Sequence, residues 1–229
     1  MVRADVGRPG DRCGRLRPAG IRAHAVRARA PRRARRPHRR PRFRDRCTGH
    51  GRRQQPRGGL ALDLALARPD LVERLVLVAA SPTGYPYDDW PTAPSEAELD
   101  ARIEAAEAAG DLDLVNRLEV RYWLDGVDEP EGRVTGARSL MLEMNGLALH
   151  ATAGPDARTG PSWTRLSEVS CATFVLVGEL DLPGTRLQAE QLAGRLPNSR
   201  FATIADSAHC PQLDQPEVLA ELVRRFVEE

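Results

Sequence analysis

The sequence predicts an α/β protein over residues 58–229, with a mostly parallel sheet, preceded by an arginine-rich segment. Three observations lead to this fold class. The composition of the chain changes sharply near residue 58. Beyond that point, three short runs are rich in apolar and β-branched residues, as buried strands are. Helical patterns lie before, between and after these runs, which is typical of a sheet with covering helices.

The charge of the chain is divided between two parts. The 229 residues include 34 basic ones, all of them arginine, and 32 acidic ones. Residues 1–57 hold 20 arginines against three acids, a net charge of +17, whereas residues 58–229 have a net charge of −15. Large apolar side chains are few in residues 1–57, too few to offset the conformational entropy lost on ordering the segment. We therefore expect residues 1–57 to be disordered, or not to be a genuine protein sequence.

Several classes of protein are excluded by the same composition. Residues 1–57 contain neither the roughly 20 apolar residues of a membrane span nor the apolar centre of a signal peptide. A transit peptide would be rich in serine, and the first serine is Ser81. The four cysteines, at positions 13, 47, 171 and 210, lack metal-site spacing. We expect a cytoplasmic protein with no membrane partner, no metal and no cofactor.

The strands are expected at three places. Leu75–Ala80 reads LVLVAA, a continuous apolar run of the kind covered on both faces of a parallel sheet. Thr173–Val177 is a second such run, and Arg200–Ala205 is a weaker third. Between the last two lies a helical segment, Thr185–Leu196, so these strands should form a parallel βαβ unit.

Further helices are expected around these strands. The segment LALDLALA before Pro69 suits a short buried helix. Ser95 and Glu98 have the spacing of a capping box, at the start of a long helical stretch that runs to about residue 153. Pro216 opens a final amphipathic helix. Its apolar face should comprise Val218, Leu219, Leu222, Val223 and Phe226. A helical insertion between two strands is typical of a cap over the carboxyl edge of a sheet.

Two polar side chains follow consecutive strands. Asp181 comes just after the second strand, and His209 just after the third. Carboxyl ends of parallel strands meet at one edge of a sheet, about 4.8 Å apart, so the two side chains can come together there. An aspartate after a strand more often caps a helix, and a lone loop histidine is more often solvated. In this order and placement, however, the pair indicates a carboxylate that holds a histidine as general base.

Over residues 58–229 the chain resembles the α/β-hydrolase superfamily. The resemblance rests on GGLALDLALARPDLVERLVLVAASP, on VLVGELDLPG and on ADSAHCPQLDQPEVLAELVRRFV. Within the helical stretch, VRYWLDG and MLEMNGLAL are similar to segments of small-ester and enol-lactone hydrolases. The resemblance implies an incomplete α/β-hydrolase fold with a helical cap at about residues 83–165. It also implies a Ser-His-Asp mechanism on an ester or lactone, with Asp181 as the triad acid and His209 as the base.

The nucleophile of that family does not occur at its expected place. A Gly-x-Ser-x-Gly elbow should precede the first helix, near residue 55, but residues 53–57 read RQQPR. Glutamine codons are CAR, so a reading frame one base later permits Gly-Asn-Ser-Leu-Gly at this point. Our hypothesis is that residues 1–57 are an out-of-frame translation that rejoins the true frame near Gly58. As written, the chain is then expected to be inactive.

A second function of a different class also fits residues 1–57. Twenty arginines in one segment would bind a polyanion such as nucleic acid through counterion release, without sequence preference and with strong salt dependence. Phe43 is the segment's single aromatic residue, so stacking on bases has little support. We rank this noncatalytic, nucleic-acid-binding alternative well below the hydrolase.

Overall fold

The computed structural model describes residues 57–151 and 160–229. Almost all of the arginine-rich segment, including the expected position of the nucleophile, lies outside the described residues. In chain order the elements are α1 Arg57–Ala67, η2 Pro69–Leu71, β1 Arg74–Val78, α2 Pro94–Ala109, α3 Leu112–Val120, η3 Arg121–Asp125, α4 Arg138–His150, η4 Ser162–Glu168, β2 Ala172–Gly178, α5 Pro183–Arg195, β3 Ser199–Ile204, α6 Pro211–Asp214 and α7 Pro216–Glu228. All three strands expected from the sequence are present, each within two residues of its expected bounds.

The sheet of the described part is three-stranded and parallel, in the order β1-β2-β3. Val76 pairs with Phe174, and Val175 pairs with Phe201. The βαβ unit predicted for β2, α5 and β3 is confirmed. Because all three strands run in the same direction, their carboxyl ends lie at one edge, which is where the loops bearing Asp181 and His209 begin.

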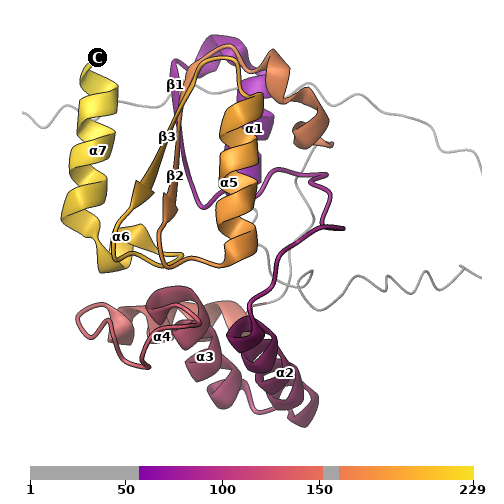
Figure 1. The fold of residues 1–229 in the computed structure, drawn as a ribbon, viewed down its shortest axis with the longest axis vertical. Helices are drawn as coiled ribbons and strands as arrows, with labels where there is room; N and C mark the ends of the chain where they lie inside the picture. The colour runs from indigo at the N-terminus through magenta and orange to yellow at the C-terminus, as the bar shows by residue number, and fades with distance from the viewer. Residues whose placement is uncertain (1–56, 152–159) are drawn as a thin grey trace, which may run out of the picture. The chain divides into compact units, whose positions relative to one another are not determined.

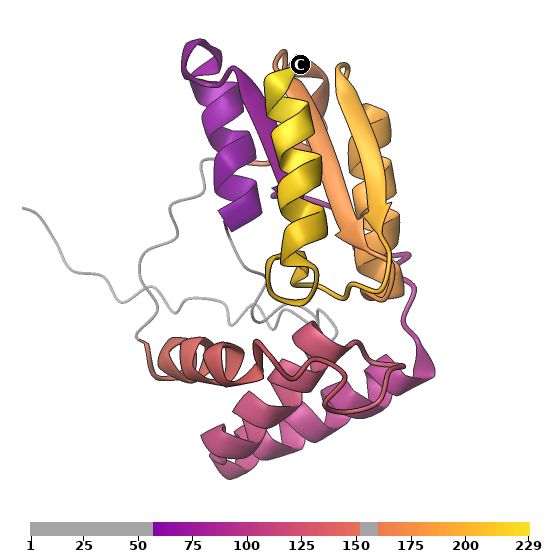
Figure 2. The same cartoon turned by 90° about the vertical axis from the view of Figure 1, so that its left-hand side faces the viewer.

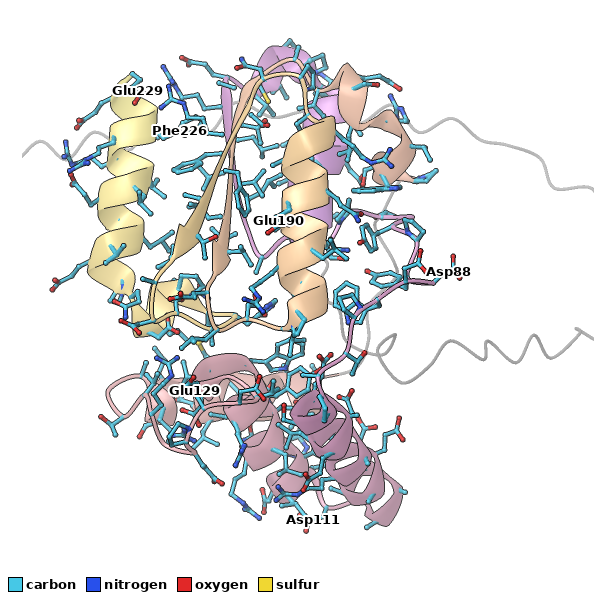
Figure 3. All side chains as sticks on the ribbon, viewed as in Figure 1. Asp88, Asp111, Glu129, Glu190, Phe226 and Glu229 are labelled. Carbon is cyan, nitrogen blue, oxygen red and sulfur yellow. The ribbon has the colours of Figure 1, made fainter. Side chains whose placement is uncertain are left out.

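Both faces of the sheet are covered by helices (Figures 1 and 2). On one face, Leu75, Leu77 and Val175 pack with α1 and α5 in a cluster that includes the fully buried Leu62 and Leu192. On the other face, α7 covers Phe174, Leu176 and Ile204. Figure 3 shows Phe226 on the side of α7 that faces the strands. Burial on both faces is therefore confirmed for β2, whereas β1 is buried on one face and half-buried on the other, and the edge strand β3 leaves Phe201 39% exposed.

The cap consists of α2, α3, η3 and α4, which Figure 1 shows grouped beyond the arrowheads of β2 and β3. Leu99, Val115, Leu118 and Tyr122 form an apolar cluster inside it, and Leu182 from the loop after β2 packs into the same cluster. The segments on either side of the cap pack on the body instead. Tyr85 and Trp163 meet edge to face, with ring centroids 4.7 Å apart, in the same cluster as Leu62.

Two local expectations were wrong. The helix α2 begins at Pro94, earlier than the Ser95–Glu98 capping box requires, and it is Glu96 that accepts a hydrogen bond from the Ala93 amide, at 3.3 Å. Ser95 instead donates to the Asp128 carboxylate. In α7, Val218 is 45% exposed and lies off the buried face. In both cases the spacing of the residues fits the expected role. Tertiary contacts nevertheless determine which side chain caps α2 and which residues of α7 are buried.

Among the described residues, no helix has the length and apolar character needed to cross a membrane.

Candidate active site

Asp181 lies in the tight loop that follows β2. Its side chain is almost fully buried, and its Oδ1 accepts a hydrogen bond from the Leu182 amide at 2.8 Å. The strand ends at Gly178, where a Cβ atom would stand 2.0 Å from the Ala208 carbonyl oxygen. Only glycine therefore lets the loop after β3 pass so close to the end of β2, and this close approach brings His209 to Asp181.

His209 lies on the loop between β3 and α6. Its Nδ1 atom is 3.0 Å from Oδ2 and 3.2 Å from Oδ1 of Asp181. The loop turns at Asp206, which has a left-handed backbone with φ of 53°, a conformation that aspartate tolerates better than most residues. The structure thus brings together the two site residues predicted from the sequence, 28 positions apart in the chain.

The electrostatics of the pair raise the pKa of the His209 imidazole. Burial lowers the pKa of His209, whereas the charge of Asp181 and the hydrogen bond to it raise that pKa, and the net shift is upward from the ordinary value. A carboxylate placed on Nδ1 fixes the tautomer and stabilises the imidazolium. Chemically, such a pair can take a proton from a hydroxyl group and hold it.

The contact of Trp123 with His209 was not predicted from the sequence, where this tryptophan fits either a substrate pocket or the packing of cap helices. Its ring centroid lies 4.6 Å from that of His209, and its carbonyl oxygen accepts the His209 amide at 3.2 Å. It belongs to η3, a π-helical turn that continues α3. Such turns are frequent at functional sites. No sequence signal marks this turn, so the contact could not be predicted.

The other chemically suggestive residues do not join the pair. Cys210 is buried among apolar side chains, and burial, followed by the charges of Asp181 and Asp214, raises its pKa to about 12. Its thiol is therefore a poor nucleophile. Glu179 is exposed and accepts the Asp206 amide at 3.3 Å. His150 is exposed in the last turn of α4.

No cluster of three or more potential metal ligands is found within residues 57–151 and 160–229. Residues 53–56, most of the stretch expected to hold the nucleophile, lie outside the described residues.

Comparison with known sequences identifies two related curated proteins, although no model of a protein family matches the chain. Both are named pimeloyl-[acyl-carrier protein] methyl ester esterase. The protein from Yersinia enterocolitica is 27% identical over 178 residues, which cover 75% of this chain and 67% of the relative. The protein from Aeromonas hydrophila is 25% identical over 185 residues, which cover 74% of this chain and 67% of the relative.

Solved structures with a similar fold include two hydrolases. One is a 2-hydroxy-6-oxo-6-phenylhexa-2,4-dienoate hydrolase from Rhodococcus sp. strain RHA1, with a TM-score of 0.54 and 15% identity. The other is an esterase from Exiguobacterium antarcticum, with a TM-score of 0.53 and 20% identity. Each match covers 75% of this chain, but only 61% and 63% of the respective solved chains. The chain thus spans about three fifths of the length of these structures.

Proposed function

We propose that this chain is an α/β hydrolase whose intact form hydrolyses a carboxylic ester or lactone by a Ser-His-Asp mechanism, an assignment supported by its similarity to two curated esterases and to solved hydrolase folds. The proposal rests on one observation above all. Asp181 and His209 follow neighbouring parallel strands and meet at 3.0 Å, at the carboxyl edge of the sheet. This is where ligands bind in open α/β sheets.

The chemistry assigned to the pair follows from its geometry. In the proposed first step, the serine oxygen attacks the ester carbonyl carbon while His209 takes the serine proton. Asp181, on the Nδ1 side of the ring, stabilises the imidazolium that forms. The imidazolium then gives its proton to the departing alcohol, which leaves an acyl-enzyme. Water attacks that acyl group, again with His209 as the base, and releases the acid and the free serine.

The serine itself is proposed to belong immediately before α1. Residues 53–57 of the chain read RQQPR and offer no nucleophile of this type. We attribute this to the out-of-frame translation of residues 1–57, whose shifted frame permits Gly-Asn-Ser-Leu-Gly at the same place. The chain as written should therefore show no turnover by this mechanism, since the loss of the nucleophile removes covalent catalysis.

The substrate class is proposed from the relatives. Their names specify a methyl ester, so an ester of a small alcohol is the first substrate to test. The cap places the ring of Trp123 against that of His209, and this aromatic side chain suits an apolar acyl group better than a charged one.

The test is an esterase and lactonase assay on three forms of the chain, with short-chain methyl esters and small lactones as probes. The chain as written is the first form. The second carries the restored frame, and the third is the restored chain with His209→Asn. We expect turnover only from the second, with an initial burst of alcohol that indicates an acyl-enzyme. Replacing His209 should reduce kcat by about 10⁴-fold or more.

Two outcomes would overturn the proposal. One is a restored chain no more active than its His209→Asn variant. The other is turnover by the chain as written that depends on His209, because a nucleophile other than the proposed serine would then be at work.

A further inference from the structure

Arg133 connects the cap to the loop that carries His209. The residue lies between η3 and α4, and its guanidinium donates in two directions. Toward the cap, Nε donates to the Asp125 carbonyl at 2.8 Å, and Nη2 donates to the Leu124 carbonyl at 3.0 Å. Toward the histidine loop, Nη1 donates to the Asp206 carbonyl at 2.9 Å, and Nη2 lies 3.1 Å from Asp214 Oδ2.

The partner carboxylate holds the residues immediately before His209. The side chain of Asp214 is fully buried. Its Oδ1 accepts the Ser207 hydroxyl and its Oδ2 accepts the Ala208 amide, both at 2.7 Å. Together with the bond from Arg133 to the carbonyl of the left-handed Asp206, these contacts bind three consecutive residues of the loop. The position of His209 therefore depends on this buried charge cluster.

On the cap side, the same guanidinium closes the turn that carries Trp123. Leu124 and Asp125, whose carbonyls it binds, are the last two residues of η3. Trp123, directly before them, contacts His209 through its ring at 4.6 Å and through its carbonyl at 3.2 Å. Arg133 thus binds the two residues that follow Trp123 in η3 and, on the other side, Asp206 and Asp214 in the segments that flank His209.

We propose that Arg133 is a positioning residue that sets His209 against Trp123 and Asp181 by joining η3 to the loop before His209. The catalytic meaning of this role rests on the proposed hydrolase function, but the role itself is a property of the fold. Arginine suits it because the planar guanidinium has five N–H donors, enough for all four acceptors, whereas lysine has a single ammonium group with three.

The chain offers a matched control in Arg138. Arg133 and Arg138 both lie in the cap, their side chains are 20% and 23% exposed, and each pairs with a fully buried carboxylate. Arg138 pairs with the Asp125 carboxylate and also donates to the Val134 carbonyl, and both contacts lie within the cap. Loss of either arginine leaves a buried carboxylate uncompensated and should lower stability similarly.

The experiment is site-resolved amide hydrogen exchange by NMR on the full chain, with two amides as reporters. The His209 amide donates to the cap through Trp123, whereas the Ala208 amide donates to Asp214. In Arg133→Met we expect both amides to exchange faster, relative to global unfolding, by about tenfold or more, as the loss of charged hydrogen bonds implies. In Arg138→Met both should keep their protection relative to global unfolding.

Arg133→Lys separates the two halves of the proposed role. The ammonium can still neutralise Asp214, so the Ala208 amide should stay protected. It cannot also bind both cap carbonyls, so the His209 amide should exchange faster, and the Nδ1 proton of His209 should exchange faster with it. A merely structural arginine would affect both amides alike.

Equal protection of the His209 amide in Arg133→Met and Arg138→Met would overturn the inference. If Arg133→Met fails to fold, the double variant Arg133→Met/Asp214→Asn removes the uncompensated charge, and protection of its His209 amide at the wild-type level would overturn the inference equally. None of these readouts requires turnover, so they can fail while the hydrolase proposal stands, and the reverse also holds.

Discussion

At the scale of single residues, His209 is subject to two opposed effects. Burial disfavours its charged form, while Asp181 at 3.0 Å favours it, and the pKa of His209 is raised as a net result. Protonated His209 therefore contributes to folding stability. With a folded pKa above the unfolded value of about 6.5, this contribution is complete below that pH and is lost as the pH rises through the folded pKa.

Asp181→Asn should reverse the shift. Without the carboxylate, burial alone acts on the imidazole, so the pKa of His209 should fall below its ordinary value of about 6.5. The pKa is measured by NMR titration of the His209 ring protons, assigned with His209→Asn. A His209 pKa that stays raised in Asp181→Asn would show that another group is its electrostatic partner.

That Asp181 and His209 lie close together could be predicted from the sequence, because each follows a recognisable strand. Sequence-based prediction failed for Trp123 and Arg133, which lie 86 and 76 positions before His209 and reach it only through the packing of the cap. Local rules also could not place the start of α2, because Ser95 with Glu98 has the spacing of a capping box, whereas the helix begins at Pro94 and uses Glu96.

At the scale of elements, the parallel sheet depends on helices that bury one side and expose the other. The helix α1 shows this most clearly. Leu62 is fully buried in the apolar cluster that includes residues of β1 and α5, while Leu64, two positions later, is 48% exposed. The sequence LALDLALA is apolar almost all round, so it predicted the helix but not its buried side. The packing against the sheet decides that side.

Leu62→Ala should lower the free energy of unfolding by about 2–5 kcal/mol, because it opens a cavity in the main apolar cluster. Leu64→Ala, the same change on the same helix, should alter it by no more than about 0.5 kcal/mol. Urea denaturation of both variants measures the difference. Equal losses would mean that α1 does not pack on the sheet as described here.

Element boundaries also show where sequence patterns lose their power. The strands were predicted within two residues because continuous apolar runs have clear ends. The π-helical turn η3 was not predicted, since its residues RYWLD have no pattern that separates them from the end of α3. On α4, Leu140, Met144 and Leu147 are at least 49% exposed, so the apolar residues of this helix do not by themselves mark its buried side.

At the scale of the whole molecule, residues 58–229 have the fold of an α/β hydrolase from the first covering helix onward. The match to this chain covers two thirds of the length of the curated relatives and about three fifths of the length of the solved structures. The sequence predicted this fold because its elements follow a distinctive order. A strand is followed by a cap, then by a strand that ends before Asp181, a helix, and a strand that ends before His209. The sequence could not supply the nucleophile, which no described residue provides at the expected place.

The central claim is that Asp181 and His209 are the acid and base of a serine triad whose nucleophile precedes α1. Its most direct test is to read the coding DNA in all three frames from its start through codon 60. We predict that a one-base shift encodes Gly-x-Ser-x-Gly directly before Gly58 and joins the frame of residues 58–229. A verified frame with no such motif in either shifted reading would contradict the claim, and would leave the Asp181–His209 pair without its proposed partner.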